Sequence, residues 1–156
     1  MKYDEYRFKF YLNASHSIYI KGVLGEEHPH TWEIIIDTIK LTSGFIIFND
    51  VEKYIEKYMD KYQDSYINSI EPFTTLNPTL ENICSYFKDD IQRLLIELGW
   101  ILVSIEISET PTRSYIIDLS NRVSTKRDLM VLNSKKEDII NSSANEKLIE
   151  FEKKIG

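Results

Sequence analysis

Three histidines are the residues of this chain best suited to bind a metal ion. His28 and His30 lie two positions apart, His16 lies twelve positions before His28, and the 156 residues contain no other histidine. In an extended strand, side chains two positions apart project from the same face. Three neutral imidazoles with an open fourth position are typical of catalytic zinc sites. The spacing therefore predicts a zinc site. The alternative is that each histidine makes only an ordinary hydrogen bond.

The composition is that of one folded domain of ordinary size. Of the 156 residues, 42% are hydrophobic and 28% are charged, a balance typical of globular rather than disordered proteins. The formal net charge of -6 leaves no surplus of basic side chains to neutralise phosphate groups. We therefore expect no nucleic-acid partner and no membrane partner. A small molecule is easier to accommodate.

Cysteine usage and the N-terminal residues bear on the cellular compartment. Cys84 is the single cysteine, which excludes an internal disulfide framework and is typical of a reducing environment. Segment 1–7 lacks the apolar run of a signal peptide, and no window reaches the roughly 18 apolar residues of a membrane span. The sequence therefore predicts a cytoplasmic protein. Because Cys84 lies in an apolar helical stripe, we expect a packed thiol.

Two segments of alternating polarity are expected to carry the histidines. Between Tyr6 and His16 every second residue is apolar or small, which predicts a half-buried strand with His16 on its inward face. Segment 18–27 contains two glycines and is expected to be a loop. Segment 30–41, rich in isoleucine and threonine and preceded by His28 on the parity of His30, predicts a second strand, antiparallel to the first. Its first residues should lie beside His16.

Two amphipathic helices are expected after the second strand. Asn49 or Asp50 is a suitable cap for the first helix, whose apolar residues recur every three or four positions. For the second helix, Asn77 is a candidate cap, Pro78 suits the first helical position and Gly99 marks the end.

Two further strands complete the expected fold. Segment 100–108 alternates apolar with polar residues, and Glu109 follows on the apolar parity. Segment 113–119 predicts the last strand. Beyond it the composition shifts to Asn, Ser, Lys and Glu. We therefore assign residues 1–119 to one domain and 120–156 to a polar extension, partly helical or mobile.

Four motifs occur in an order that resembles a known family. They are Phe8-x-Phe10-x-x-x-Ala14-x-His16, His28-Pro29-His30-Thr31-Trp32, Pro78-Thr79-Leu80-Glu81-Asn82 and Ile105-Glu106-Ile107-Ser108-Glu109-Thr110. With these motifs the chain resembles the 6-pyruvoyl-tetrahydropterin synthase and 6-carboxy-tetrahydropterin synthase family, from about Tyr6 to Asp118. The order and spacing of the motifs carry the resemblance, because no single motif is specific.

The resemblance implies an α+β fold, the tunnel-fold or T-fold. Its members have a four-stranded antiparallel sheet with two helices packed on one face, in the order β-β-α-α-β-β. Sheets from several subunits close into a barrel, which removes the exposed edges of each sheet. We therefore expect self-association into a homo-oligomer, a trimer or a hexamer.

The resemblance also implies a function and a set of site residues. Zn2+ would be bound by His16, His28 and His30 and would polarise the oxygens of the substrate side chain. Glu109, with Thr79 nearby, would hold the guanidine-like edge of a pterin. The expected activity is that of a lyase acting on 7,8-dihydroneopterin triphosphate or a related pterin. The 6-carboxy branch of the family connects this chemistry with queuosine biosynthesis.

The proton-transfer residues of the family are replaced in this chain. Leu24 occupies the position of the family cysteine, and Glu26 or Glu27 is a candidate base in the same loop. The alternative is that both glutamates are solvated loop charges. Gln63 and Asp64 stand where the family has an aspartate–histidine pair, so Asp64 is a further candidate base, weak at its ordinary pKa.

These replacements leave more than one function open. The first is a zinc-dependent lyase with altered proton-transfer residues. The second is a catalytically degenerate T-fold module that binds zinc and a pterin-like or purine-like ligand without turnover. The third is a structural homo-oligomer in which zinc only ties the strands together.

Overall fold

The structure is a computed structural model that describes residues 4–123. Of the extension predicted for 120–156, only the short 3-10 helix η2 (Ser120–Val123) is included, and the rest lies outside the described residues. Within residues 4–123, neither α-helix is both long enough and apolar enough to cross a lipid bilayer.

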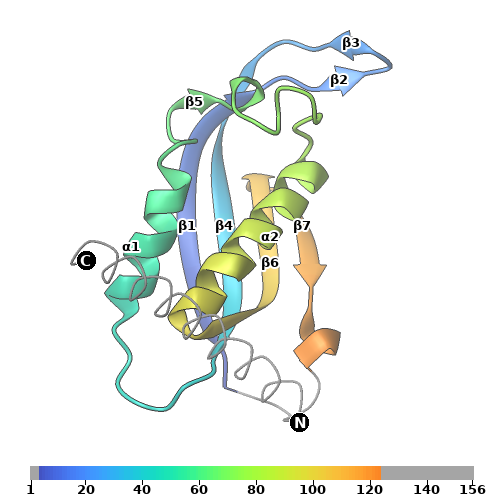
Figure 1. Cartoon of the computed structure of the whole chain (residues 1–156). Coiled ribbons are helices and arrows are strands. Elements are labelled where there is room, and N and C mark those ends of the chain that lie inside the picture. Colours follow the sequence, from blue (N-terminus) through green and yellow to red (C-terminus); the bar gives the residue numbers. More distant parts are fainter. Residues whose placement is uncertain (1–3, 124–156) are drawn as a thin grey trace, which may run out of the picture.

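Two layers make up the fold, a mainly antiparallel sheet and two helices that cover one of its faces (Figure 1). The long strands are β1 (Tyr6–His16), β4 (His28–Lys40), β6 (Trp100–Thr110) and β7 (Arg113–Asp118). The helices are α1 (Phe48–Met59) and α2 (Leu80–Leu98). A short strand, β5 (Ser65–Tyr66), pairs in parallel with β1 and gives the order β5-β1-β4-β6-β7. The predicted sheet and its two helices are confirmed, with one short strand added.

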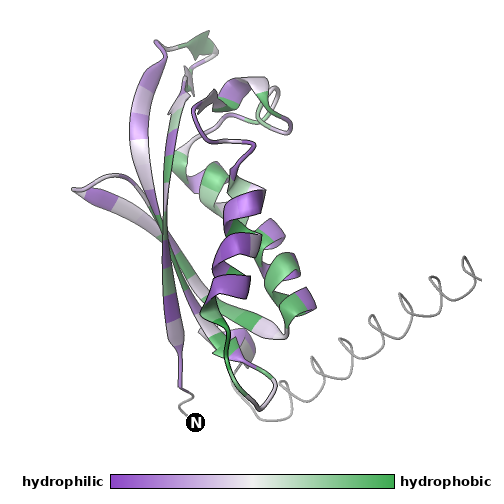
Figure 2. Ribbon diagram, turned by 90° about the vertical axis from the view of Figure 1, so that its left-hand side faces the viewer, coloured by the Kyte–Doolittle hydropathy of each residue, from purple (hydrophilic) through white to green (hydrophobic). Residues whose placement is uncertain are grey.

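The alternation predicted for β1 places its apolar side chains in the core. Phe8, Phe10 and Leu12 are buried, and so are the residues opposite them on β4. Both helices lie on this face, while the other face of the sheet is open (Figure 2). Cys84 on α2 is also buried in this core, and burial raises the pKa of its thiol to about 12. The prediction of a packed thiol is confirmed.

Helix α1 begins before the position that the sequence predicts. Its N-cap is Ile47, which makes no side-chain capping hydrogen bond, so the prediction of a cap at Asn49 or Asp50 is wrong. Phe48 opens the helix, and its ring centroid lies 5.6 Å from that of Tyr6. Aromatic packing against β1 therefore holds the start of α1 without a capping side chain.

Helix α2 is capped by a residue other than the predicted one. The Thr79 hydroxyl accepts a hydrogen bond from a backbone N–H in the first turn at 3.2 Å, so Thr79 replaces Asn77 as the cap and Pro78 precedes the helix. The Asn77 side chain instead bonds the backbone N–H and carbonyl of Tyr19, both at 2.9 Å. Gly99 ends the helix as predicted, with a left-handed φ of 88°.

The segment predicted as a loop, 18–27, contains a small hairpin. Its strands are β2 (Tyr19–Ile20) and β3 (Val23–Leu24). Lys21 and Gly22 between them both have positive φ, which suits a tight two-residue turn. The Asn68 amide bonds the N–H and carbonyl of Ser17 at 2.9 and 2.8 Å. Two asparagine side chains thus fix the chain where it leaves β1.

Candidate metal centre

The three histidines meet at one end of the sheet, where β1 ends and β4 begins. His16 pairs directly with His28, and His30 lies opposite Ala14 in the same register. One nitrogen of each imidazole lies within 4.8 Å of the other two. The convergence predicted from strand parity is therefore present, and one ion can reach all three rings.

Backbone carbonyl groups orient two of the imidazoles. Nδ1 of His16 lies 2.8 Å from the carbonyl oxygen of Pro78, and Nδ1 of His28 lies 3.1 Å from that of Glu26. Because a carbonyl oxygen only accepts, each Nδ1 carries the hydrogen and each Nε2 keeps its lone pair. Outer contacts of this kind fix the tautomer in which histidine binds a metal.

Two of the inward-pointing nitrogens lack a partner. Nε2 of His16 and Nε2 of His30 are buried and make no hydrogen bond. A buried polar atom without a partner is costly, and a bound ion would supply the partner. Burial is the main factor that lowers the pKa of both imidazoles, which favours the neutral form that binds metals. The donor set therefore fits a metal ion such as zinc.

Glu109 reaches this centre from the end of β6, on the same parity as the buried Ile105 and Ile107. The register between β6 and β7 shifts between Ser108 and Thr110, which leaves Glu109 without a residue opposite it. Glu109 is 8% exposed, so its inward direction, predicted from the parity of β6, is confirmed.

Both oxygens of the Glu109 carboxylate face other groups of this chain. Oε2 lies 3.8 Å from Nε2 of His16 and 3.9 Å from Nε2 of His30. Oε1 accepts from Nε of Arg113 at 2.9 Å, and Nη2 of the same guanidinium also lies 2.9 Å from it. The carboxylate therefore connects the histidine centre with an arginine from the start of β7.

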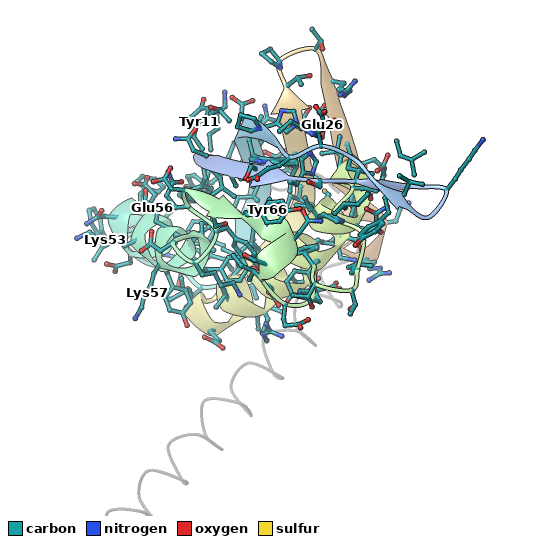
Figure 3. The ribbon with its side chains drawn as sticks, turned by 90° about the horizontal axis from the view of Figure 1, so that it is seen from above. Tyr11, Glu26, Lys53, Glu56, Lys57 and Tyr66 are labelled. Atoms are coloured by element: carbon teal, nitrogen blue, oxygen red, sulfur yellow. The ribbon has the colours of Figure 1, made fainter. Side chains whose placement is uncertain are left out.

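The two glutamates predicted as candidate bases lie on the connection from β3 to β4 and are exposed. Figure 3 shows Glu26 from above, at the end of the sheet that carries the histidines. Glu26 contacts the centre through its backbone carbonyl on His28. Oε1 of Glu27 accepts a hydrogen bond from the Ser15 hydroxyl at 2.6 Å. This contact gives the Glu27 carboxylate a defined position.

Asp64 lies beside the same end of the sheet. Asp64 and His30 line one hollow of about 430 Å³. Asp64 has a positive φ of 56°, and its backbone N–H donates to the carbonyl of Asn13 at 2.7 Å. A left-handed conformation is uncommon for a residue other than glycine and is tolerated best by Asn and Asp. The chain then pairs with β1 as β5, which keeps Asp64 at the histidine end.

Thr79 directly follows the residue whose carbonyl holds His16. Its hydroxyl accepts a hydrogen bond as the cap of α2, which leaves the hydroxyl hydrogen free to donate. The predicted contact of Thr79 with a substrate stays a prediction.

Comparison with known proteins identifies the family. The family model described as 6-pyruvoyl tetrahydropterin synthase matches residues 5–120. The chain belongs to this family. The resemblance predicted from four motifs is therefore confirmed over most of the described chain. A comparison with curated proteins found no match.

Solved structures of family members share the fold. The 6-pyruvoyl tetrahydropterin synthase of Caenorhabditis elegans superposes with a TM-score of 0.62 at 16% identity, covering 74% of this chain and 94% of that one. The Plasmodium falciparum enzyme gives 0.57 at 16% identity, covering 73% and 96%. A Plasmodium vivax variant, whose catalytic glutamate is replaced by alanine, gives 0.55 at 12% identity, covering 73% and 97%. The predicted T-fold is confirmed.

Two family positions that are replaced in this chain lie on β3 and in the segment after α1. Leu24, aligned by motif with the family cysteine, belongs to β3 and is 45% exposed. Gln63, aligned with the family aspartate, uses its side-chain oxygen to accept from the backbone N–H of Asn13 at 3.2 Å. Both residues have side chains that do not transfer protons, so neither supplies the chemistry of the family residue that it replaces.

Sequence reasoning missed three contributors to this centre. The Pro78 carbonyl orients His16, and Asn68 fixes the backbone after β1. Neither role has a local sequence signal, because each contact joins segments more than 50 residues apart. Arg113 did have a signal: it lies four residues after Glu109 across a two-residue turn, where opposite charges can pair.

Proposed function

We propose that this chain is a zinc-dependent lyase of the pterin synthase type, acting on 7,8-dihydroneopterin triphosphate or a related pterin. The observation that carries the proposal is the histidine centre, in which two buried Nε2 atoms lack partners and the Glu109 carboxylate stands beside them. Residues 1–119 form the domain that carries this activity.

The proposed ion is zinc, held by His16, His28 and His30. Three neutral imidazoles leave one coordination position for a substrate oxygen. When bound there, zinc would act as a Lewis acid and ease proton removal from the carbon atoms beside that oxygen. The carbonyl groups on Nδ1 of His16 and of His28 keep both rings oriented for this role.

Glu109 is the proposed anchor for the pterin ring. A pterin presents a guanidine-like edge with two parallel N–H donors, and a carboxylate accepts such a pair with charge assistance. Because Glu109 is nearly buried, water competes little for its oxygens. Thr79, with its free hydroxyl hydrogen, is proposed as a second contact.

Glu27 is the residue we favour as the proton-transfer group. Its carboxylate is held by the Ser15 hydroxyl, and Glu27 directly precedes the proposed ligand His28. Glu26 and Asp64 remain the other candidates, and Asp64 is supported by the hollow that it shares with His30. A catalytic glutamate in the similar Plasmodium vivax protein supports a glutamate for this role.

The proposed assembly is a homo-oligomer, a trimer or a hexamer. Within residues 4–123, β5 covers the outer edge of β1 only at Ala14 and Ser15, and β7 pairs with β6 alone. Open edges of this length invite pairing with another chain. Joining β1 of one copy to β7 of the next would close the sheets into a barrel, with the open face of Figure 2 inside. Light scattering should then give three or six times 18.4 kDa, and a monomer would contradict the assembly.

A second candidate function is binding without turnover. Leu24 and Gln63, which replace proton-transfer residues, favour it. Such a module would keep zinc and bind a pterin-like or purine-like ligand at Glu109, with no product formed.

A turnover assay separates the two candidates. Zinc-loaded full-length protein is incubated with 7,8-dihydroneopterin triphosphate, and the pterin products are separated by chromatography. The lyase predicts triphosphate release and a new pterin, both lost on chelation and in Glu109→Ala. If the loaded protein forms no product but still binds the pterin, the lyase is wrong and the binding module stands.

A further inference from the structure

We propose that Arg113 competes with the ligand for the Glu109 carboxylate, so that a guanidine-like edge binds only when Arg113 leaves. The inference rests on the proposed role of Glu109 as the anchor. It assigns to Arg113 the part of an internal competitor that sets the affinity of the site.

In the structure, the Arg113 guanidinium already occupies one oxygen of the Glu109 carboxylate. Nε and Nη2 of Arg113 both lie 2.9 Å from Oε1 of Glu109. Oε2 faces the imidazoles of His16 and His30 at 3.8 and 3.9 Å. A ligand that needs two parallel acceptors on this carboxylate therefore meets one oxygen already engaged by a guanidinium.

Arginine resembles the ligand edge in chemistry. Its guanidinium presents N–H groups side by side in one plane, and a 2-amino-4-oxopyrimidine ring presents its ring N–H and amino N–H in the same way. A carboxylate that accepts the first is suited to accept the second. Arg113 thus makes with the Glu109 carboxylate the kind of contact that the ligand is proposed to make.

Arg113 is much more exposed than Glu109, so a ligand can replace the Arg113 guanidinium at the carboxylate. The Arg113 side chain is 65% exposed, whereas the Glu109 side chain is 9% exposed. The guanidinium can return to water at little cost, because it is already largely hydrated. The buried carboxylate cannot, and it needs another donor when Arg113 leaves. A ligand edge would supply that donor.

The backbone keeps the competitor close to the anchor. Arg113 pairs with Thr110 across a two-residue turn, so both partners belong to one hairpin. The effective concentration of the guanidinium at the carboxylate is therefore high. If the anchor is free in only about a tenth of the molecules, the apparent affinity for a ligand falls about tenfold.

Isocytosine, which is the 2-amino-4-oxopyrimidine ring without substituents, is the probe that tests the inference. Its binding to zinc-loaded full-length protein is measured by calorimetry for wild type, Arg113→Ala, Arg113→Lys and the double variant Arg113→Ala with Glu109→Gln. Arg122→Ala is the control, since it removes one positive charge from the exposed end beyond β7. Zinc affinity, from competition with a chelating dye, is the second readout.

Arg113→Ala should bind isocytosine about 3- to 10-fold more tightly than wild type, by removal of the competitor. The isocytosine affinity of Arg113→Lys should lie between those of wild type and Arg113→Ala, because an ammonium lacks the planar pair of donors. The gain should vanish in Arg113→Ala combined with Glu109→Gln, and Arg122→Ala should match wild type. Zinc affinity should stay unchanged in Arg113→Ala.

Unchanged or weaker isocytosine binding by Arg113→Ala would overturn the inference, as would the absence of binding by every variant. These outcomes are distinct from failure of the proposed function, which is the absence of pterin turnover by zinc-loaded wild type. Tighter isocytosine binding without turnover would support Arg113 as competitor and leave the site a binding module.

Discussion

The histidine centre and the candidate proton-transfer residues lie at the same end of the sheet, but different kinds of structure position them. The histidines come from two long paired strands, and backbone carbonyls hold two of them. Glu26, Glu27 and Asp64 come from exposed connections. Strand register fixes the first group, whereas a few side-chain contacts position the second. The residues proposed to bind zinc are therefore placed by regular secondary structure, whereas the candidate bases depend on individual side-chain and loop contacts.

The largest expected effect is the loss of zinc affinity when one of the histidines is replaced. His16→Ala removes a buried ligand, and we expect zinc binding to weaken by at least about 100-fold, more than loss of an outer contact would cause. Ser15→Ala, one position earlier on the open face, should retain zinc. Metal content after dialysis measures both. Full zinc occupancy in His16→Ala would mean that the ion is held elsewhere.

The next effect separates the candidate bases. Glu27→Gln should lower kcat by about 10²- to 10⁴-fold, the usual contribution of a general base, with zinc affinity unchanged. Glu26→Gln should stay close to wild type, because Glu26 contacts the centre through its backbone carbonyl. Steady-state kinetics on the triphosphate measure the series. If Asp64→Asn lowers kcat and Glu27→Gln does not, the base is Asp64.

A smaller effect concerns the helix that supports the centre. Thr79→Ala removes the cap of α2 and should lower the free energy of unfolding by about 1 kcal/mol. Thr79→Ser keeps the hydroxyl and should recover most of it. Urea unfolding of the metal-free protein gives both values. Equal stability of the two variants would show that the hydroxyl does not hold the helix.

The smallest expected effect is on the free energy of unfolding and concerns an ion pair away from the histidine centre. Hydrogen bonds from Arg7, at 2.7 and 3.0 Å, are the main factor that lowers the pKa of Asp37. Because this pKa is lower folded than unfolded, the stabilisation is present above about pH 4 and is lost as the pH falls further.

Asp37→Asn should therefore lower the free energy of unfolding by at most about 1 kcal/mol at pH 7, and by less at pH 3. Urea midpoints at the two pH values measure the difference. Zinc affinity should not change at pH 7, since Arg7 and Asp37 pair near the far end of β1 from His16. A stability difference that grows as the pH falls would contradict the assigned direction.

The sequence predicts the strand-borne part of the site and misses the contacts between distant segments. Alternation along β1 and β4 is enough to place the three histidines together, because parity decides the face of a strand. The start of α1 escapes prediction, since the ring of Phe48 packs on Tyr6 more than 40 residues away. Asn77 looks like a cap locally but bonds Tyr19 instead. Local propensity yields to tertiary contacts at these positions.

Zinc K-edge X-ray absorption of the full-length protein loaded with one equivalent of zinc tests the histidine centre most directly. We predict three imidazole nitrogens at about 2.0–2.1 Å with one further oxygen ligand, and loss of one imidazole in His28→Ala. A spectrum with fewer than three imidazoles in the wild type, or one unchanged in His28→Ala, would contradict a zinc site formed by His16, His28 and His30.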